Sequence, residues 1–389
     1  MSHLSAIPTL PVIGVLLLTM TGCKGCQSET GINPDPLDTG EAAFTNDFGQ
    51  WLSMGTMSDG SPAITYYDAT QTGIGFAIAQ VGDDGTVSWS HEAVDGYPVE
   101  GLDNGERGKF TTMAIAADDT VWVFYQDFGL GTLRYGKRDP ATGEWTTDLA
   151  DVGGGAASDA GYFASASLDA SGNPIVVHYD KARQNLRIVR RIADKFEGEV
   201  LAEGVDYDPG DGSEVITADV GEFSTIQVSG GIEYVAYYDR TYGDLKLSWG
   251  TPGAHTIETV DDVGDVGQWP DLLIDSGTIH ISYQDISNQD LRYASGEPGR
   301  WSSIVIDEGD YVGADSSIFL ESGAISIAYF DGRNNDMKLA WQDGGAWVLD
   351  TVTGTDSAQG FHNEVVTSSQ GTFAACYDYT HRTLWFSSL

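Results

Sequence analysis

The sequence predicts an all-β protein, and three observations support this class. Aromatic residues are abundant, with 10 Trp, 18 Tyr and 14 Phe, and the chain contains 49 Gly. Aromatic side chains fit pleated surfaces, and Gly supplies the positive φ angles of tight turns. After residue 30 the chain shows no long apolar pattern of helical period. The third observation is an internal repeat, which refines the class to one architecture.

A short element containing Tyr and Asp recurs seven times. The copies are ITYYDATQTGIGF (64–76), VFYQDFGLGTLRY (123–135), VHYDKARQNLRI (177–188), VAYYDRTYGDLKL (235–247), ISYQDISNQDLRY (281–293), IAYFDGRNNDMKL (327–339) and ACYDYTHRTLWF (375–386). Their aligned acids, 46 to 59 residues apart, are Asp68, Asp127, Asp180, Asp239, Asp285, Asp331 and Asp378. A repeat of this period indicates one supersecondary unit used seven times.

Each repeat unit contains four strand-like segments. The first begins at Gly-x-aromatic, as in FGQW (48–51), and ends at a small turn such as SDG (58–60) or DSG (275–277). The second carries the Tyr, the third begins at Leu-Arg or Leu-Lys, and a fourth often begins with Trp and ends near Val-Asp, as in WSSIVID (301–307). Four short antiparallel strands per unit are typical of a propeller blade, so the sequence predicts a seven-bladed β-propeller.

The ends of the repeat region predict how the ring closes. The seventh unit stops at Leu389 after its third strand, whereas EAAFTND (41–47) precedes the first Gly-x-aromatic, where a fourth strand precedes the other units. We expect this N-terminal segment to complete the last blade and so to remove an exposed sheet edge.

Residues 41–389 resemble bacterial seven-bladed propellers of the sialidase-like, BNR-type class that are anchored as lipoproteins. The resemblance implies a fold and not an activity. The Asp-box of true sialidases, Ser-x-Asp-x-Gly-x-x-Trp, is not matched, since GDDGTVSW (82–89) and PATGEW (140–145) have other spacings.

The N-terminal region predicts export and lipid anchoring. Residues 7–20, IPTLPVIGVLLLTM, have the length of a signal-peptide core and lead to Met20-Thr21-Gly22-Cys23. This ending resembles a bacterial lipobox, which implies a signal peptide at 1–22 and a lipid on Cys23. The alternative is an ordinary signal peptide cut elsewhere. Residues 23–40 are rich in Pro, Gly and Asp, so we expect a flexible tether to a membrane of the cell envelope, the outer membrane.

Charge and cysteine content narrow the possible partners. With 19 basic and 58 acidic residues, the net charge is −39, which repels a polyanion and argues against nucleic acid as a partner. Cys23, Cys26 and Cys376 do not form a disulfide framework, and Cys376 lies in an apolar run, where a buried free thiol is expected.

One face of the propeller is predicted to carry the ligand site. The Gly-x-aromatic element and the Asp loop both point to that face, with the aromatics nearer the axis. Candidate stacking residues for a glycan or protein ligand are Trp51, Phe110, Phe163, Phe223 and Trp269, and the repeat departs from the aromatic at Asp315 and His362. The alternative for the aromatics is that they wedge neighbouring blades together.

The Asp loops give a structural prediction and a weaker functional one. We expect the seven aligned aspartates to accept backbone N–H groups and close hairpin turns, and the preceding Tyr residues to pack between blades. Four arginines in these loops are candidates for binding an anionic group or for local pairing with acids: Arg183, Arg240, Arg333 and Arg382.

An acidic insertion at 205–219 is the only cofactor candidate. It contains Asp206, Asp208, Asp211 and Glu214 among glycines, a composition that binds Ca²⁺ weakly or forms a solvated loop. Otherwise no cofactor is expected.

Three functions remain open at this level. The sequence has no G-x-S-x-G, H-E-x-x-H or phosphate-binding Gly loop, so the first hypothesis is a non-enzymatic, lipid-anchored propeller that binds a glycan or a protein. The alternatives are a glycan-processing hydrolase or lyase, using paired carboxylates in the central channel, and a scaffold of an envelope assembly.

Overall fold

The structure is a computed structural model of the chain that describes residues 46–82, 85–98, 105–155, 158–210, 212–309, 311–354 and 356–389. All of these residues belong to one compact unit. They form 27 strands, and no helix among them is long and apolar enough to cross a membrane. The all-β prediction is confirmed.

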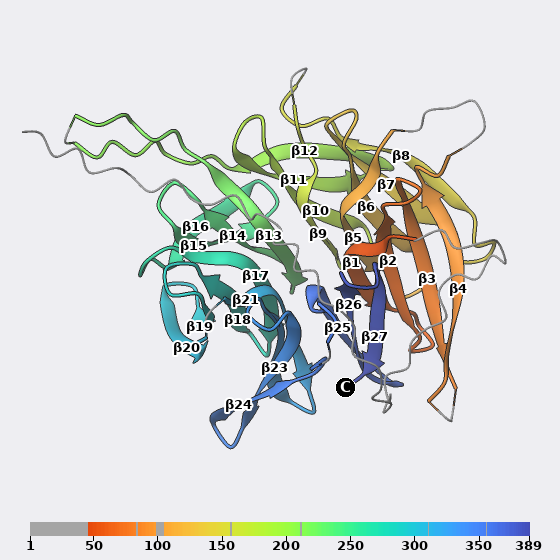
Figure 1. Ribbon diagram of the computed structural model, residues 1–389. Helices are drawn as coiled ribbons and strands as arrows, with labels where there is room; N and C mark the ends of the chain where they lie inside the picture. Colours follow the sequence, from red (N-terminus) through yellow and green to blue (C-terminus); the bar gives the residue numbers. More distant parts are fainter. Residues whose placement is uncertain are drawn as a thin grey trace, which may run out of the picture. The chain divides into compact units, whose positions relative to one another are not determined.

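The strands form seven antiparallel sheets in chain order, here called blades 1 to 7 (Figure 1). The first strands of the blades are β1 (Phe48–Thr56), β5 (Arg107–Ile115), β9 (Tyr162–Leu168), β13 (Val220–Ser229), β17 (Val266–Asp275), β21 (Val312–Glu321) and β25 (Phe361–Ser368). The second strands are β2 (Pro62–Asp68), β6 (Val121–Asp127), β10 (Pro174–Asp180), β14 (Ile232–Asp239), β18 (Thr278–Asp285), β22 (Ala324–Asp331) and β26 (Gly371–Asp378).

The outer half of each blade follows in the same order. The third strands are β3 (Gly73–Val81), β7 (Thr132–Arg138), β11 (Asn185–Ile192), β15 (Asp244–Thr251), β19 (Asp290–Glu297), β23 (Asp336–Asp343) and β27 (Thr383–Ser388). The fourth strands are β4 (Val87–Asp95), β8 (Trp145–Asp151), β12 (Lys195–Ala202), β16 (Ala254–Asp261), β20 (Arg300–Asp307) and β24 (Ala346–Thr351). In the described part of the chain blade 7 has three strands.

The predicted fourth strand of blade 7 lies mostly outside the described residues. Residues 41–45 are not described, and Asn46 and Asp47 precede β1 without strand structure. The completion of blade 7 by 41–47 therefore stays a prediction.

The blades nevertheless form a closed ring, because each first strand contacts the first strand of the next blade and β25 contacts β1. Every seam carries the same hydrogen bond, from the backbone N–H that precedes the repeat Gly to a carbonyl in the second-to-third-strand loop of the preceding blade. For blades 1 to 2 the pair is Arg107 N and Thr72 O, at 3.1 Å. For blades 7 to 1 it is Phe48 N and Arg382 O, at 3.2 Å. The predicted seven-bladed ring is confirmed.

The hydrophobic core is divided among the seams. Seven clusters of buried side chains occur, and each one combines residues of two neighbouring blades. The cluster between blades 7 and 1 includes Phe373 and Phe386 on one side and Phe48 and Met54 on the other. Blade 1 is therefore held to blade 7 by apolar burial as well as by hydrogen bonds.

The Tyr residues of the repeat join neighbouring blades through their hydroxyl groups. In blades 2, 5 and 6 the Tyr two residues before the aligned Asp donates its hydroxyl backward to an acid that ends the preceding blade: Tyr125 to Asp95, Tyr283 to Asp261 and Tyr329 to Asp307, at 2.5 to 2.8 Å. Where Tyr lies directly before the Asp, the hydroxyl donates forward to an acid just before the next first strand: Tyr67 to Glu106, Tyr179 to Asp219, Tyr238 to Asp265 and Tyr377 to Asp47, at 2.7 to 2.9 Å. These bonds to carboxyl acceptors are short, and they bridge the seams.

Candidate functional site

The site is built from the third residue of each Gly-x-aromatic unit, at the start of each first strand. These seven residues, here called the mouth ring, are Trp51, Phe110, Phe163, Phe223, Trp269, Asp315 and His362. All seven have φ between 45° and 54°, the left-handed region that bulky residues rarely adopt. At each position the first strand also contains one residue more than its partner, as in Asp271↔Ser282 after Gln268↔Gln284. The mouth ring therefore consists of β-bulges, which re-aim a side chain out of the sheet.

The repeat Gly is required because the bulge brings the first strand against the preceding blade. The seven glycines have φ between 94° and 111°. A Cβ on Gly221 would lie 2.6 Å from Leu186 Cβ, and one on Gly267 would lie 2.7 Å from Leu245 Cα. Only Gly combines this φ with such a close approach.

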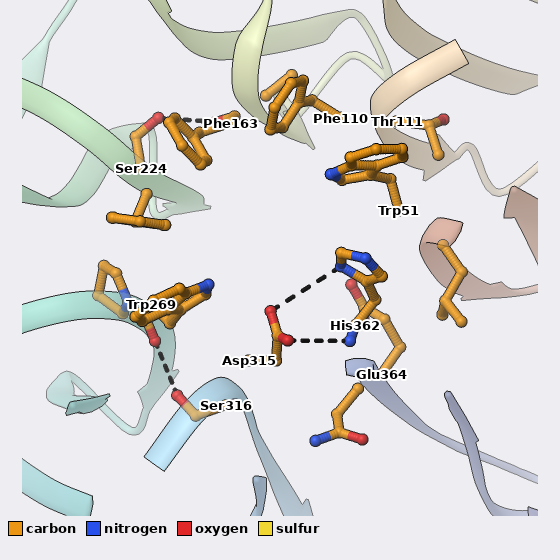
Figure 2. A pocket seen from close by; sticks show the side chains of 15 residues that line it. Trp51, Phe110, Thr111, Phe163, Ser224, Trp269, Asp315, Ser316, His362 and Glu364 are labelled. Carbon is orange, nitrogen blue, oxygen red and sulfur yellow. Dashed lines mark hydrogen bonds and ion pairs between the residues drawn. The ribbon is translucent and has the colours of Figure 1, made fainter. Parts of the chain in front are cut away.

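The mouth-ring side chains surround a single cavity of about 200 Å³ (Figure 2). The five aromatic side chains are half-buried and line the cavity, so they are not enclosed between blades. The cavity is lined by the mouth ring and by the residues that follow each member, Leu52, Thr111, Ala164, Ser224, Pro270, Ser316 and Asn363, together with Glu364.

The aromatic part of the ring is continuous. Neighbouring centroids are 5.4 Å apart for Trp51 and Phe110, 5.0 Å for Phe110 and Phe163, 4.4 Å for Phe163 and Phe223, and 4.4 Å for Phe223 and Trp269. The His362 ring continues the series at 5.5 Å from Trp51. Such separations are those of favourable aromatic pairs.

The remaining arc of the mouth ring is polar. Asp315 Oδ2 accepts the backbone N–H of His362 at 3.1 Å, and Asp315 Oδ1 lies 4.0 Å from His362 Nδ1 (Figure 2). Burial lowers the pKa of His362, although the Asp315 carboxylate partly opposes this, so the imidazole is neutral near pH 7. The serines beside this arc are engaged, since Ser316 Oγ donates to Trp269 O at 2.9 Å and Ser224 Oγ donates to Phe163 O at 3.0 Å.

Two further acids lie one layer deeper, each two residues after a mouth-ring member. Burial raises the pKa of Glu364 well above its usual range, and the carboxylates of Asp271 and Asp315 add to this shift. Burial also raises the pKa of Asp271 to about 6, although the N–H groups of Ile318 and Leu272 donate to its carboxylate at 2.8 Å. The protonated form of Glu364 is therefore favoured, as is usual for crowded carboxyl groups.

Asn363 is the least satisfied polar side chain of the cavity. It is 5% exposed, and within the described residues neither its Nδ2 nor its Oδ1 has a hydrogen-bond partner. Glu364 likewise makes no side-chain hydrogen bond to any described residue. Sequence reasoning missed Asn363, Glu364 and Asp271. The only feature of the sequence that marks these three residues is their position, one or two residues after a mouth-ring residue.

The structure places the four loop arginines outside the lining of the cavity. Arg183 Nη1 lies 3.5 Å from Asp180 Oδ2, and Arg240 Nη1 lies 3.3 Å from Glu222 Oε1. Arg382 supplies the seam carbonyl between blades 7 and 1, and Arg333 does not approach the cavity. No lysine or arginine belongs to the described residues that line the cavity.

The aligned aspartates accept backbone N–H groups of their own loops in six blades. Asp68, Asp127, Asp239, Asp285, Asp331 and Asp378 bind N–H groups two or three residues downstream, at 2.9 to 3.1 Å. Asp180 differs, because it accepts from Gly154 N and Ser158 Oγ in the loop before β9, both at 3.0 Å.

The acidic insertion shows no gathered ligands in its described part. Asp206 accepts the N–H of Ala218 at 2.8 Å, Asp208 accepts that of Gly210 at 2.9 Å, and Glu214 is exposed. Across the described ranges, no three His, Cys, Asp or Glu side chains are arranged to hold a metal ion, and Asp211 lies outside those ranges. The calcium site stays a prediction.

Of the three cysteines, only Cys376 is described. It is fully buried and free, its Sγ accepts the N–H of Gly360 at 3.2 Å, and burial raises its pKa. The predicted lipid attachment residue, Cys23, and the tether lie outside the described residues.

Exposed apolar side chains gather in the loops of the face that carries the mouth ring. Apart from positions on strands and Leu389, every exposed large hydrophobic residue of the described chain lies in a second-to-third or fourth-to-first-strand loop: Phe128, Leu130, Val152, Val205, Tyr207, Val215, Ile216, Tyr242, Val263, Tyr311 and Tyr379. Described turns on the opposite face contribute none. The face that carries the mouth ring therefore differs from the opposite face of the propeller. Exposed apolar residues that gather on one face are typical of interaction surfaces.

Comparison with known proteins shows the fold alone. No family model matches the chain, and no curated protein matches it. Among solved structures, the polysaccharide lyase Uly1 is similar with a TM-score of 0.52 and 10% identity, over 86% of this chain and 88% of the lyase. A puromycin hydrolase mutant, in complex with PGG, has a TM-score of 0.51 and 12% identity, over 84% of this chain and 50% of the hydrolase. A structure from a study of two prolyl endopeptidases has a TM-score of 0.47 and 12% identity, over 88% of this chain. The chain spans about half the length of the puromycin hydrolase and of the endopeptidase structure.

Proposed function

We propose that this chain is a lipid-anchored envelope propeller that binds a glycan or a protein segment, without catalysis, at the mouth of its central channel. The observation that carries the proposal is that each of the seven blades contributes one mouth-ring residue to the lining of a single cavity, and five of these residues are half-buried aromatics. All seven blades have the bulge, so the bulge belongs to the fold. The identity of the side chain is then free, and aromatic side chains that line a cavity suit ligand stacking.

The polar groups of the cavity favour binding over catalysis. His362 Nδ1 and Asp315 Oδ1 are 4.0 Å apart, beyond hydrogen-bond reach, and the hydroxyls of Ser224 and Ser316 are committed to backbone carbonyls. No nucleophile and base are therefore paired, as nucleophilic catalysis requires. The apolar loop residues around the cavity add contact area for a ligand larger than the cavity itself.

The test is binding of the purified protein to arrayed glycans and arrayed peptides. We expect a ligand on one array whose binding falls at least tenfold in Trp51→Ala and Trp269→Ala. Trp301→Ala is the matched control, because Trp301 lies on the outer strand β20 and bonds Glu258 instead of lining the cavity. If neither array gives a ligand, or if Trp301→Ala weakens binding as much as the other two, the proposal fails.

One observation favours a second function, a glycan-processing hydrolase or lyase. The carboxyl groups of Glu364 and Asp315 lie in the same cavity, and burial raises the pKa of Glu364 well above its usual range. Glycoside chemistry uses a pair of carboxyl groups, one of which has a raised pKa. Incubation with a panel of polysaccharides tests it through release of reducing ends or of unsaturated sugars. Activity that is abolished by Glu364→Gln and by Asp315→Asn would replace the binding function with this one.

Lipid anchoring and outer-membrane location are supported by the sequence of residues 7–23 alone. We expect Cys23→Ser to move the protein from the membrane fraction to the soluble fraction in a bacterial host. A Cys23→Ser protein that stays in the membrane fraction would exclude lipid on Cys23 as the anchor.

A further inference from the structure

We infer that the group received by the mouth-ring cavity is an alkylammonium, such as a lysine side chain or a methylated amine. This inference rests on the proposed binding site and adds the chemistry of the ligand. It is carried by the charge of the cavity wall, the aromatic faces, the unpaired polar atoms and the size of the cavity.

The cavity wall attracts cations and repels anions. Its ionisable groups are Asp315, His362 and Glu364, with Asp271 one layer below, and no lysine or arginine belongs to the described lining. The protein as a whole adds a net charge of −39. A carboxylate, sulfate or phosphate ligand would therefore enter a negative field, in which the nearby Lys109 at the rim is already paired with Glu106.

The aromatic faces are suited to an ammonium group. The negative face of an aromatic ring attracts a cation within about 6 Å of its centroid, and several rings around one space are a known arrangement for quaternary ammonium ligands. The protein already shows this contact at the rim, where Lys109 Nζ lies 5.6 Å from the Trp51 centroid and 4.8 Å from the Phe128 centroid. Glu106 completes that pair at 2.6 Å, so an aromatic face and a carboxylate hold one ammonium together. Asp315 and the mouth-ring aromatics offer the same combination inside the cavity.

One polar side chain of the wall offers a free acceptor within the described chain. The Glu364 carboxyl lines the cavity, is half-buried and makes no hydrogen bond to another described residue. The N–H groups of a primary or partly methylated ammonium can donate to its oxygens. Asn363 also lacks partners in this part of the chain, but its amide atoms are covered and do not reach the open cavity.

The size of the cavity fits a side chain better than a chain of sugars. Its volume of about 200 Å³ is below the 300–1,000 Å³ of typical small-molecule sites. A single alkylammonium group fits such a space, while the molecule that carries it would lie over the apolar loop residues outside.

The experiment measures binding to the purified full-length protein by tryptophan fluorescence and calorimetry, with four probes. Choline and n-butylammonium are the cationic probes, 3,3-dimethylbutanol is the uncharged isostere of choline, and methyl glucoside represents a neutral sugar. We expect each cation to bind at least tenfold tighter than 3,3-dimethylbutanol. Preference for n-butylammonium would identify an unmethylated, lysine-type ligand, and preference for choline would identify a methylated ammonium.

Variants separate the cavity from the rest of the face. Asp315→Asn keeps an acceptor for the His362 N–H while it removes the charge, and we expect it to weaken choline binding at least tenfold. Trp269→Leu tests the aromatic contribution. The matched control is Glu222→Gln, since Glu222 lies on the same face beside Arg240 but outside the cavity, and we expect it to leave binding unchanged.

The outcomes distinguish the inference from the proposed function. Equal binding of choline and 3,3-dimethylbutanol, or binding of methyl glucoside alone, would overturn the ammonium inference and leave the binding site standing. Failure of all four probes overturns the ammonium inference, and the glycan and peptide arrays then decide the proposed function independently.

Discussion

At the seven mouth-ring positions, a non-glycine residue holds φ near 50°, which costs about 1–2 kcal/mol per residue. The strain is present in every blade, and in every blade the repeat Gly packs the start of the bulge closely against the preceding blade. Aromatic residues at five of these positions therefore do not reflect local backbone preference. The side chains at these positions line the cavity, which is consistent with the binding site that we propose there.

Replacing a repeat Gly tests this packing directly. We expect Gly221→Ala to lower the free energy of unfolding by about 2–4 kcal/mol, because the added Cβ would lie 2.6 Å from Leu186 Cβ and its φ of 104° is strained for Ala. The matched control is Gly230→Ala, whose φ is also positive but whose Cβ meets nothing within 4 Å. Denaturant unfolding measures both. Equal losses in the two variants would show that contact with the preceding blade is not what selects Gly.

The buried carboxyl of Glu364 gives a pH-dependent prediction for stability. Because the pKa of Glu364 is raised in the folded protein, the folded state binds this proton more tightly than the unfolded state does. The free energy of unfolding therefore falls as the pH rises from the unfolded-state pKa, about 4.3, towards the higher folded-state pKa. Glu364→Gln removes this loss. We expect the variant to match the wild type at pH 4 and to exceed it by about 1–3 kcal/mol at pH 8. The control is Glu144→Gln, at an exposed turn position. A difference that is constant with pH would contradict the prediction.

The inferred binding of a cation should depend on pH through the same group. When Glu364 loses its proton, the cavity gains a negative charge beside Asp271 and Asp315. We therefore expect the affinity for choline to rise with pH in the wild type and to rise less in Glu364→Gln, where Asp271, with its pKa raised to about 6, still gains a charge. Calorimetry in buffers of different ionisation enthalpy would show proton release on binding. Affinity that falls with rising pH would contradict this coupling.

At the scale of the strand and the loop, the position of the Tyr in the repeat decides which seam its hydroxyl can bridge. In blades 2, 5 and 6 a Tyr two residues before the Asp reaches backward, and in blades 1, 3, 4 and 7 a Tyr directly before the Asp reaches forward. His178 occupies the backward position in blade 3 and pairs with Asp151 at 3.0 Å. The Tyr element of the repeat is therefore mainly a connection between blades.

A pair of Tyr→Phe variants measures the strength of this connection. Tyr283 is fully buried, and its hydroxyl bonds Asp261 at 2.5 Å and Ser303 at 2.8 Å. We expect Tyr283→Phe to lower the free energy of unfolding by about 1–3 kcal/mol. Tyr66 occupies the same register in blade 1, but its hydroxyl has only a 3.4 Å contact with His91, so Tyr66→Phe should cost less than about 1 kcal/mol. Thermal and denaturant unfolding of both variants gives the comparison, and equal costs would argue against a role of the acid.

The repeat allowed the sequence to predict the blades, the ring and the face that holds the aromatics, because a sevenfold pattern reports on every blade at once. It did not predict Asn363, Glu364 or Asp271. The position after each mouth-ring member holds Leu, Thr, Ala, Ser, Pro, Ser or Asn, so no recurring residue type marks it. The orientation of the aromatics also depends on a backbone bulge, and Gly-x-aromatic alone is compatible with wedging between blades as well.

At the scale of the whole molecule, closure of the ring follows from the equivalence of the seams. The bond from Phe48 N to Arg382 O repeats the bond found at the other six seams, and Tyr377 reaches Asp47 as Tyr238 reaches Asp265. The described blades thus leave no seam without the backbone hydrogen bond. A closed ring also fixes the mouth-ring residues relative to one another, which a cavity built from seven blades requires.

The net charge of −39 gives the last prediction, which also tests the acidic insertion. Self-repulsion of this size destabilises a folded protein and is screened by salt, since the Debye length falls from about 30 Å at 0.01 M to about 3 Å at 1 M. We expect the Tm to rise by several degrees between 0.01 M and 0.5 M NaCl. Because Asp206 and Asp208 already accept backbone N–H groups, we expect 1 mM CaCl₂ and 1 mM MgCl₂, each in 0.15 M NaCl, to give the same Tm. A rise with calcium alone that disappears in Asp208→Asn would instead establish a calcium site in residues 205–219, because general screening does not distinguish the two ions.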